Sequence, residues 1–158
     1  MWGLAISPDG NKIASGSKDN TIKIWNSVSG DLMRSLNGHS FEVISVNFSP
    51  SGQLLVSGSV DMTLRVWNTY SGECLKKCTG HTHIVYTSIF SPDGKLIASG
   101  SADESIKLWD TETWSVISTL NGHSGYVRCL VFTENKEKIV SASMDRTIKV
   151  WDVEVGLS

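Results

Sequence analysis

The sequence repeats itself every 42 residues. The tryptophans that keep this interval are Trp25, Trp67, Trp109 and Trp151. The aspartates that keep it are Asp19, Asp61, Asp103 and Asp145. A shared period without an insertion or deletion indicates one supersecondary unit stacked four times, in which each copy packs on its neighbours.

Each copy carries the patterns of short β-strands. The segments before the tryptophans read TIKIW, TLRVW, SIKLW and TIKVW, in which apolar and polar residues alternate with a period of two. Upstream of them, KIASGS, LLVSGS, LIASGS and IVSASM are more continuously apolar, which predicts a strand buried on both faces. Val43 to Phe48 is a third strand that runs into the turn at 49–52, and Cys74 to Cys78 is a fourth. Four antiparallel strands per period predict a propeller blade.

A Gly-His pair recurs at the same interval. The pairs are Gly38-His39, Gly80-His81 and Gly122-His123. With the aspartate and a Trp-Asp pair they resemble the WD-repeat family over essentially the whole chain, although Asn26 and Asn68 stand where the family has aspartate. The resemblance implies an all-β fold with four blades of four-stranded antiparallel sheet, either half of a ring or a fragment of a seven- or eight-bladed propeller. We expect the blades at about 1–36, 37–78, 79–120 and 121–158.

The length leaves the closure of the ring open. Four full periods of 42 residues make 168, and the chain has 158. Met1 aligns with Val43 and Ser158 with Cys74, so we expect a trimmed boundary within the first strand and a fourth blade with three strands and a free edge. Two copies can form an eight-bladed homodimer, the chain can belong to a larger parent propeller, or it can close alone as a ring of four blades.

The resemblance implies a hydrogen-bonded network in each blade. In the family it joins the histidine of the Gly-His loop, a serine of the second strand, the turn aspartate and the tryptophan. The sets here are His39, Ser57, Asp61 and Trp67; His81, Ser99, Asp103 and Trp109; and His123, Ser141, Asp145 and Trp151. The first blade keeps Ser15, Asp19 and Trp25 without a histidine.

Serine, histidine and aspartate are also the parts of a hydrolase triad. A triad occurs once, beside an oxyanion hole and a substrate cleft, whereas this set recurs in every blade and is tied to a tryptophan donor. No GxSxG motif is present in the sequence. We therefore expect a structural network and no enzyme.

The sequence contains no convincing pattern of metal ligands. His81 and His83 form an H-x-H pair, but His81 belongs to the repeat network and no carboxylate or thiol stands at ligand spacing beside them. The three cysteines, Cys74, Cys78 and Cys129, contain no CxxC pair, and we expect them to be free thiols in a reducing compartment. We predict no metal and no cofactor.

Individual function is expected at positions that differ from copy to copy. In WD-repeat proteins the face that carries the Gly-His loops often binds peptides, through residues that enter the innermost strand and through the residue before the turn aspartate. The candidates here are Trp2, Lys18, Glu42, Ile44, Val60, Ile84, Tyr86, Ala102, Tyr126, Arg128 and Met144. Aromatic residues, methionine and arginine are enriched in protein interfaces. Packing between blades is the alternative for any one of them.

Charge and composition limit the classes of partner that the chain is expected to bind. The 14 basic and 16 acidic residues are spread along the chain without a run of like charge, which argues against nucleic acid. The apolar runs are much shorter than the roughly 20 residues of a membrane helix, so we expect no membrane span. We expect no signal peptide either. The predicted function is a non-catalytic scaffold for other proteins or peptides, with the cytoplasm as the expected location and the nucleus as the alternative. Self-assembly into a ring is the alternative.

Overall fold

The computed structural model describes residues 3–153, and the described chain is entirely β-structure. The strands of the first two repeats are β1 (Gly3–Ile6), β2 (Lys12–Gly16), β3 (Ile22–Asn26), β4 (Leu32–Leu36), β5 (Val43–Phe48), β6 (Leu54–Ser59), β7 (Leu64–Asn68) and β8 (Cys74–Cys78). Those of the last two are β9 (Val85–Phe90), β10 (Leu96–Ser101), β11 (Ile106–Asp110), β12 (Val116–Leu120), β13 (Val127–Phe132), β14 (Lys138–Ser143) and β15 (Ile148–Asp152). Residues 3–153 contain no helix of the length and apolarity that a membrane span requires.

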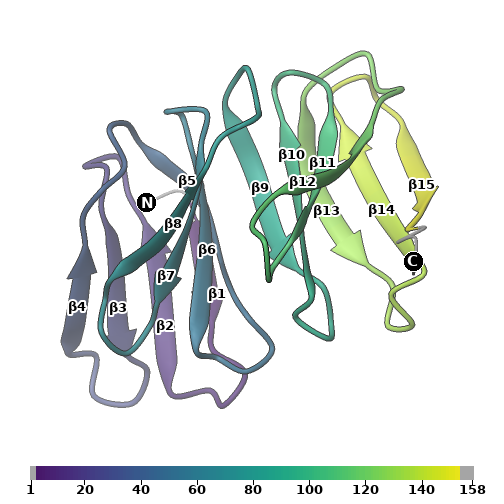
Figure 1. Cartoon of the computed structure of the whole chain (residues 1–158). Coiled ribbons are helices and arrows are strands. Elements are labelled where there is room, and N and C mark those ends of the chain that lie inside the picture. Colours follow the sequence, from purple (N-terminus) through teal and green to yellow (C-terminus); the bar gives the residue numbers. More distant parts are fainter. Residues whose placement is uncertain (1–2, 154–158) are drawn as a thin grey trace.

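The strands form four antiparallel sheets in simple sequence order. Blade 1 is β1-β2-β3-β4, blade 2 is β5-β6-β7-β8, blade 3 runs from β9 to β12, and blade 4 has the three strands β13-β14-β15. Figure 1 shows the blades side by side, with their innermost strands β1, β5, β9 and β13 adjacent. This confirms the all-β propeller fold. The fourth strand predicted to begin at Ser158 lies outside the described residues.

Turns at the ends of the first hairpins need a backbone with positive φ. Gly10, Gly52 and Gly94 supply it, at φ values of 75°, 69° and 74°. Blade 4 has Lys136 at this position, with φ 63°, although a side chain makes that conformation less favourable. The ammonium of Lys136 pairs with Asp93 of blade 3 at 3.0 Å, so this turn is tied to its neighbour.

The core lies between blades rather than inside one. We call the face of a blade that meets the next blade its trailing face, and the face that meets the preceding blade its leading face. The first interface packs Ala14, Ile22, Ile24 and Leu36 of blade 1 against Val43, Val46, Phe48, Leu55 and Trp67 of blade 2. The same positions pack between blades 2 and 3 and between blades 3 and 4. Each sheet therefore needs a neighbour on both sides to bury its apolar residues.

A glycine of the second strand lets the next blade approach closely. A Cβ at Gly16 would lie 2.9 Å from Cγ1 of Val43, one at Gly58 would lie 2.7 Å from Cγ1 of Val85, and one at Gly100 would lie 2.6 Å from Cγ1 of Val127. These distances are too short for carbon atoms. We call this feature the glycine notch, and it seats the valine that starts the innermost strand of the following blade.

The chain does not close on itself as a ring of four. On the leading face of blade 1, Leu4 is 63% exposed, whereas its repeat equivalent Val46 is 6% exposed. On the trailing face of blade 4, Ile148 is 72% exposed, whereas its equivalent Ile106 is completely buried. The two end faces thus lack the neighbours that the internal faces have. In the described structure the chain therefore does not form a closed ring of four blades by itself.

The glycine notch predicts a size limit at Gly100. Gly100→Ala should lower the free energy of unfolding by about 1–3 kcal/mol, because the new methyl group overlaps Val127 and Thr87. Urea unfolding followed by tryptophan fluorescence measures this change. Adding Val127→Ala should give a cost below the sum of the two single changes. Wild-type stability of the single variant would contradict the notch.

Candidate functional site

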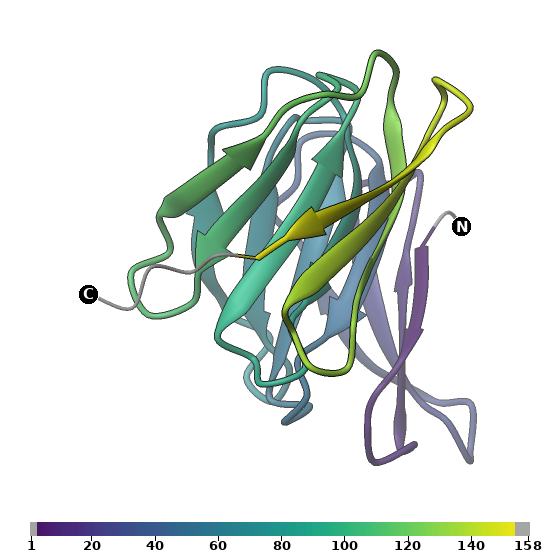
Figure 2. The ribbon, with the colours of Figure 1, turned by 90° about the vertical axis from the view of Figure 1, so that its right-hand side faces the viewer.

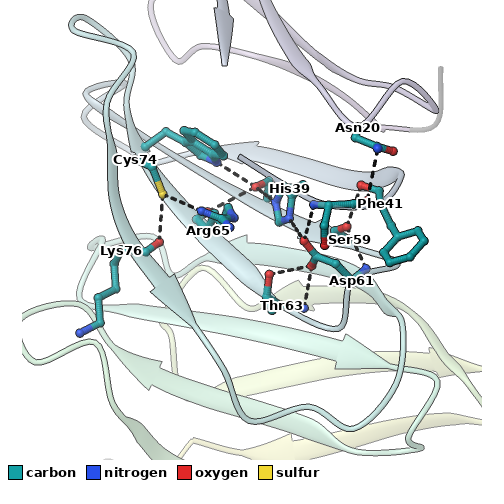
Figure 3. A network of polar contacts seen from close by, with 12 residues as sticks. Asn20, His39, Phe41, Ser59, Asp61, Thr63, Arg65, Cys74 and Lys76 are labelled. Carbon is teal, nitrogen blue, oxygen red and sulfur yellow. Dashed lines mark hydrogen bonds and ion pairs between the residues drawn. The ribbon is translucent and has the colours of Figure 1, made fainter. Parts of the chain in front are cut away.

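A hydrogen-bonded network joins the Gly-His loop before β5 to the sheet of blade 2. Nδ1 of His39 lies 2.8 Å from the carboxylate of Asp61, and its Nε2 lies 2.7 Å from the hydroxyl of Ser57. Trp67 donates its indole N–H to the same hydroxyl at 2.9 Å. Figure 3 shows His39 between the strands with Asp61 beside it. A carboxylate only accepts, so Nδ1 carries the proton, and in the neutral ring Nε2 accepts the serine O–H.

The structure assembles the other predicted sets with nearly the same geometry. In blade 3 the bonds of His81 to Asp103 and to Ser99 are both 2.7 Å, and that of Trp109 to Ser99 is 2.8 Å. In blade 4 the bonds are 2.6 Å from His123 to Asp145, 2.7 Å from His123 to Ser141 and 2.8 Å from Trp151 to Ser141.

Blade 1 holds only part of the set within the described residues. Trp25 donates to Ser15 at 2.9 Å, but Asp19 has no histidine beside it. Asp19 accepts a hydrogen bond from Thr21, as Asp61 does from Thr63, and pairs with Lys23. Its side chain is 51% exposed, against 5% for Asp61. In the complete sets the histidine and the amide of the next loop residue both bond the aspartate and cover it.

Hydrogen bonds hold the network aspartates ionised. Burial by itself would raise the pKa of Asp103, but bonds from Ser105, from the amide of Thr82 and from His81 lower that pKa to about 2. Burial also acts to raise the pKa of Asp61, but hydrogen bonds from His39 and Thr63 hold that pKa well below its usual range. Desolvation lowers the pKa of His81 despite its bond to Asp103, so the ring stays neutral near pH 7.

The geometry of the serines argues against the catalytic reading. Ser57 and Ser99 are completely buried, and Ser141 is nearly so. Each hydroxyl already receives an indole N–H and contacts a histidine nitrogen. A nucleophile must reach the carbon that it attacks, and these oxygens are covered by the fold. The network has the contacts of a structural clamp.

The H-x-H pair does not converge on a common point. His81 is committed to Asp103 and Ser99, while the ring of His83 stacks on Tyr126. Across residues 3–153, no three metal-ligating side chains gather into a possible site.

Six of the predicted partner-binding residues line one hollow. It has a volume of about 250 Å³ and lies where the innermost strands β5, β9 and β13 begin. Its lining residues are Glu42, Ile44, Val60, Ile84, Tyr86 and Arg128. Three apolar side chains, two charged groups and one aromatic ring thus meet from three different blades.

An aromatic and cationic stack borders this hollow. The guanidinium of Arg128 lies 4.0 Å from the centre of the Tyr86 ring. Tyr86 stacks on Tyr126 at 5.9 Å between ring centres, and Tyr126 stacks on His83 at 6.3 Å. The sequence reasoning did not assign His83 to this surface. Its position just before Ile84, in the loop that enters an innermost strand, is the signal that would have found it. We call the six lining residues together with His83 and Tyr126 the inner-rim surface.

The remaining candidates lie elsewhere or are covered. Lys18 and Met144 are exposed at the turns before their aspartates. Ala102 departs from the expectation, because it is only 6% exposed. Its amide donates to the carbonyl of Ile84 at 2.8 Å, so the loop lies against this turn and covers the short methyl group. Trp2 lies outside the described residues.

Repeated four-stranded sheets with a His–Ser–Asp–Trp clamp define a β-propeller of the WD type. The family described as WD domain, G-beta repeat matches residues 1–26, 30–68, 72–110 and 114–152, so the chain belongs to the WD-repeat family. Repeats of this family generally mediate protein–protein interaction, and the family is generally not catalytic.

Two curated proteins resemble parts of the chain. F-box/WD repeat-containing protein 7 of Drosophila melanogaster is 55% identical over 31 residues, which cover 20% of this chain and 2% of that protein. Nuclear distribution protein PAC1 of Arthroderma otae is 47% identical over 45 residues, which cover 28% of this chain and 10% of that protein. The chain thus matches only a small part of the length of either relative.

The clamp predicts unequal costs at equivalent serines. Ser99→Ala should lower the free energy of unfolding by about 1–3 kcal/mol, because it leaves the indole N–H of Trp109 and Nε2 of His81 buried without a partner. Ser15→Ala is the matched control. It should cost less, since Trp25 is partly exposed and water can replace the lost partner. Urea unfolding of both variants measures the difference, and equal losses would argue against a role for the histidine.

Proposed function

We propose that this chain is a non-catalytic scaffold that binds segments of other proteins at the inner-rim surface. The observation that carries the proposal is the guanidinium of Arg128, which is stacked on Tyr86 and has no carboxylate partner within residues 3–153. Such a group is fixed in place while its N–H donors remain available to a ligand.

The chemistry of the surface resembles that of binding hot spots. Tyrosine and arginine dominate such sites because a rigid ring or fork loses little entropy on binding. The hollow beside them offers the apolar side chains of Ile44, Val60 and Ile84 to a partner's apolar group. The network below holds the loops that carry these residues, so the surface is formed before a partner arrives.

Peptide selection tests the proposal. Peptides selected from a random library against the purified chain should bind at least about 10-fold more weakly to Tyr126→Ala and to Arg128→Ala, as expected for loss of a hot spot worth over 1.4 kcal/mol. Tyr70→Ala is the matched control, because Tyr70 is exposed in the β7–β8 turn at the opposite ends of the strands and should leave binding unchanged. Circular dichroism checks that the variants are folded. Equal affinity of all the variants for the selected peptides would contradict this site.

Self-assembly is the second function that a specific observation favours. The leading face of blade 1 and the trailing face of blade 4 both expose apolar side chains that are buried in the internal blades. Apolar surface of this kind drives association. We propose that two copies meet through these faces and form an eight-bladed ring, with the remaining blades of a parent propeller as the competing occupant.

Light scattering over a concentration series tests self-assembly directly. A discrete species of twice the 17.2 kDa chain mass is the expected result. A monomer at every concentration would leave the end faces to blades of a longer protein.

A further inference from the structure

Two opposite charges line the hollow of the inner-rim surface without neutralising each other. Glu42 directly precedes β5 of blade 2, whereas Arg128 lies in β13 of blade 4, and both line the same volume of about 250 Å³. Within residues 3–153, neither side chain forms an ion pair. Each charge is therefore available to a charge of opposite sign on a ligand.

The fold holds these two charges on opposite sides of blade 3. The guanidinium of Arg128 lies over the ring of Tyr86 in β9, so this side chain leans toward blade 3 and not toward the trailing face of blade 4. The carbonyl of Glu42 accepts the amide of Val60 at 3.0 Å, which fixes the chain where β5 begins. The same bond in blade 4 joins the start of β13 to the turn between β14 and β15, which lie together in Figure 2. The hollow therefore has a negative side and a positive side in fixed positions.

Apolar side chains line the rest of the hollow. Ile44, Val60 and Ile84 are partly exposed there, together with the ring of Tyr86. Apolar surface of a ligand is favourably buried against such side chains. The volume of about 250 Å³ lies below the roughly 300–1,000 Å³ of sites that enclose a small molecule. The hollow therefore suits one apolar side chain of a protein segment better than a free metabolite or cofactor.

The two charges are not part of the repeat. The positions equivalent to Glu42 in blades 3 and 4 hold apolar or aromatic residues, and so do the positions equivalent to Arg128 in blades 1 to 3. The blades thus keep the same fold without a charge at these places. Recognition of a ligand is the role that fits charges which the repeated scaffold does not need.

We infer that the hollow binds an extended protein segment in which an acidic and a basic residue stand on either side of an apolar one. The acidic residue binds Arg128, the apolar side chain enters the hollow, and the basic residue binds Glu42. The charges then fix the direction in which the segment lies, because the reverse direction brings like charges together. The inference rests on the binding function proposed above and adds the chemistry and the orientation of the partner.

A carboxylate suits this hollow better than a phosphate does. The planar fork of the Arg128 guanidinium matches the oxygens of either group. A phosphorylated side chain, however, carries nearly two negative charges at pH 7, and Glu42 lines the same hollow with another. A single carboxylate is balanced by the single guanidinium. The acidic residue of the segment is therefore an aspartate or a glutamate.

Peptides with altered charges test this assignment. The tightest of the peptides selected against the unmodified chain is compared with versions in which either charged residue is replaced by glutamine. Each replacement should weaken binding about 3–10-fold, and exchange of the two charged residues should weaken it at least about 20-fold. Phosphoserine in place of the acidic residue should bind no more tightly than the original peptide. Isothermal titration calorimetry measures these affinities.

A charge-reversed chain with Glu42→Lys and Arg128→Glu gives the reciprocal test. It should prefer the exchanged peptide and bind it within about 10-fold of the affinity of the original pair, because each charge of the peptide again meets its opposite. Neither side chain belongs to the clamp, so circular dichroism should show an unchanged fold. Glu73→Lys is the matched control, since it makes the same charge change at an exposed residue of the β7–β8 turn, at the opposite ends of the strands, and should leave binding unchanged.

The outcomes separate the chemistry of the segment from the binding site itself. If Tyr126→Ala weakens the selected peptides but they lack this order of charges, or bind equally well after the exchange, the assigned chemistry is wrong while the site stands. Tighter binding of the phosphoserine peptide would overturn the choice of a carboxylate in the same way. If no peptide is selected, or if Tyr126→Ala and Arg128→Ala leave the affinity unchanged, the proposed function fails and the inference fails with it.

Discussion

Burial of each sheet between two neighbours is the constraint on which the rest of this structure depends. A single blade has apolar side chains on both faces, and residues such as Trp67 and Leu108 reach full burial only in the cluster shared with an adjacent blade. The glycine notch sets how closely two blades approach, because a valine of one blade occupies the space where the other lacks a Cβ. The burial that stabilises the internal blades and the exposure of apolar side chains on the outer faces of blades 1 and 4 therefore have the same physical origin.

The polar clamp has a different task. Its histidine joins the loop before the innermost strand to the turn aspartate, and its serine anchors the tryptophan that packs on the preceding blade. The loops fixed in this way carry the residues of the inner-rim surface. A repeated structural motif thus holds residues that differ from blade to blade, which is the arrangement on which the proposed binding role depends.

Much of the fold could be predicted from sequence because its information is local and periodic. The spacing of Trp25, Trp67, Trp109 and Trp151 defined the repeat, and the alternation before each tryptophan defined the strands. The burial of single side chains and the backbone conformation of single turn residues were harder to predict. Ala102 was expected to be accessible and is covered by a loop, and Lys136 adopts the positive φ that glycine provides in the other blades. Both depend on neighbours that the local pattern does not contain.

By itself, the sequence determined the four repeats and the order of the strands, because these follow from intervals that recur along the chain. The membership of each His–Ser–Asp–Trp set came from the resemblance of these repeats to the WD-repeat family. Only the tertiary structure decided that His83, Tyr86, Tyr126 and Arg128 stack together, and that Leu4 and Ile148 are left exposed. These features join side chains from different blades or arise where a neighbouring blade is missing. Their geometry is set by how the sheets pack, which a period in the sequence does not specify.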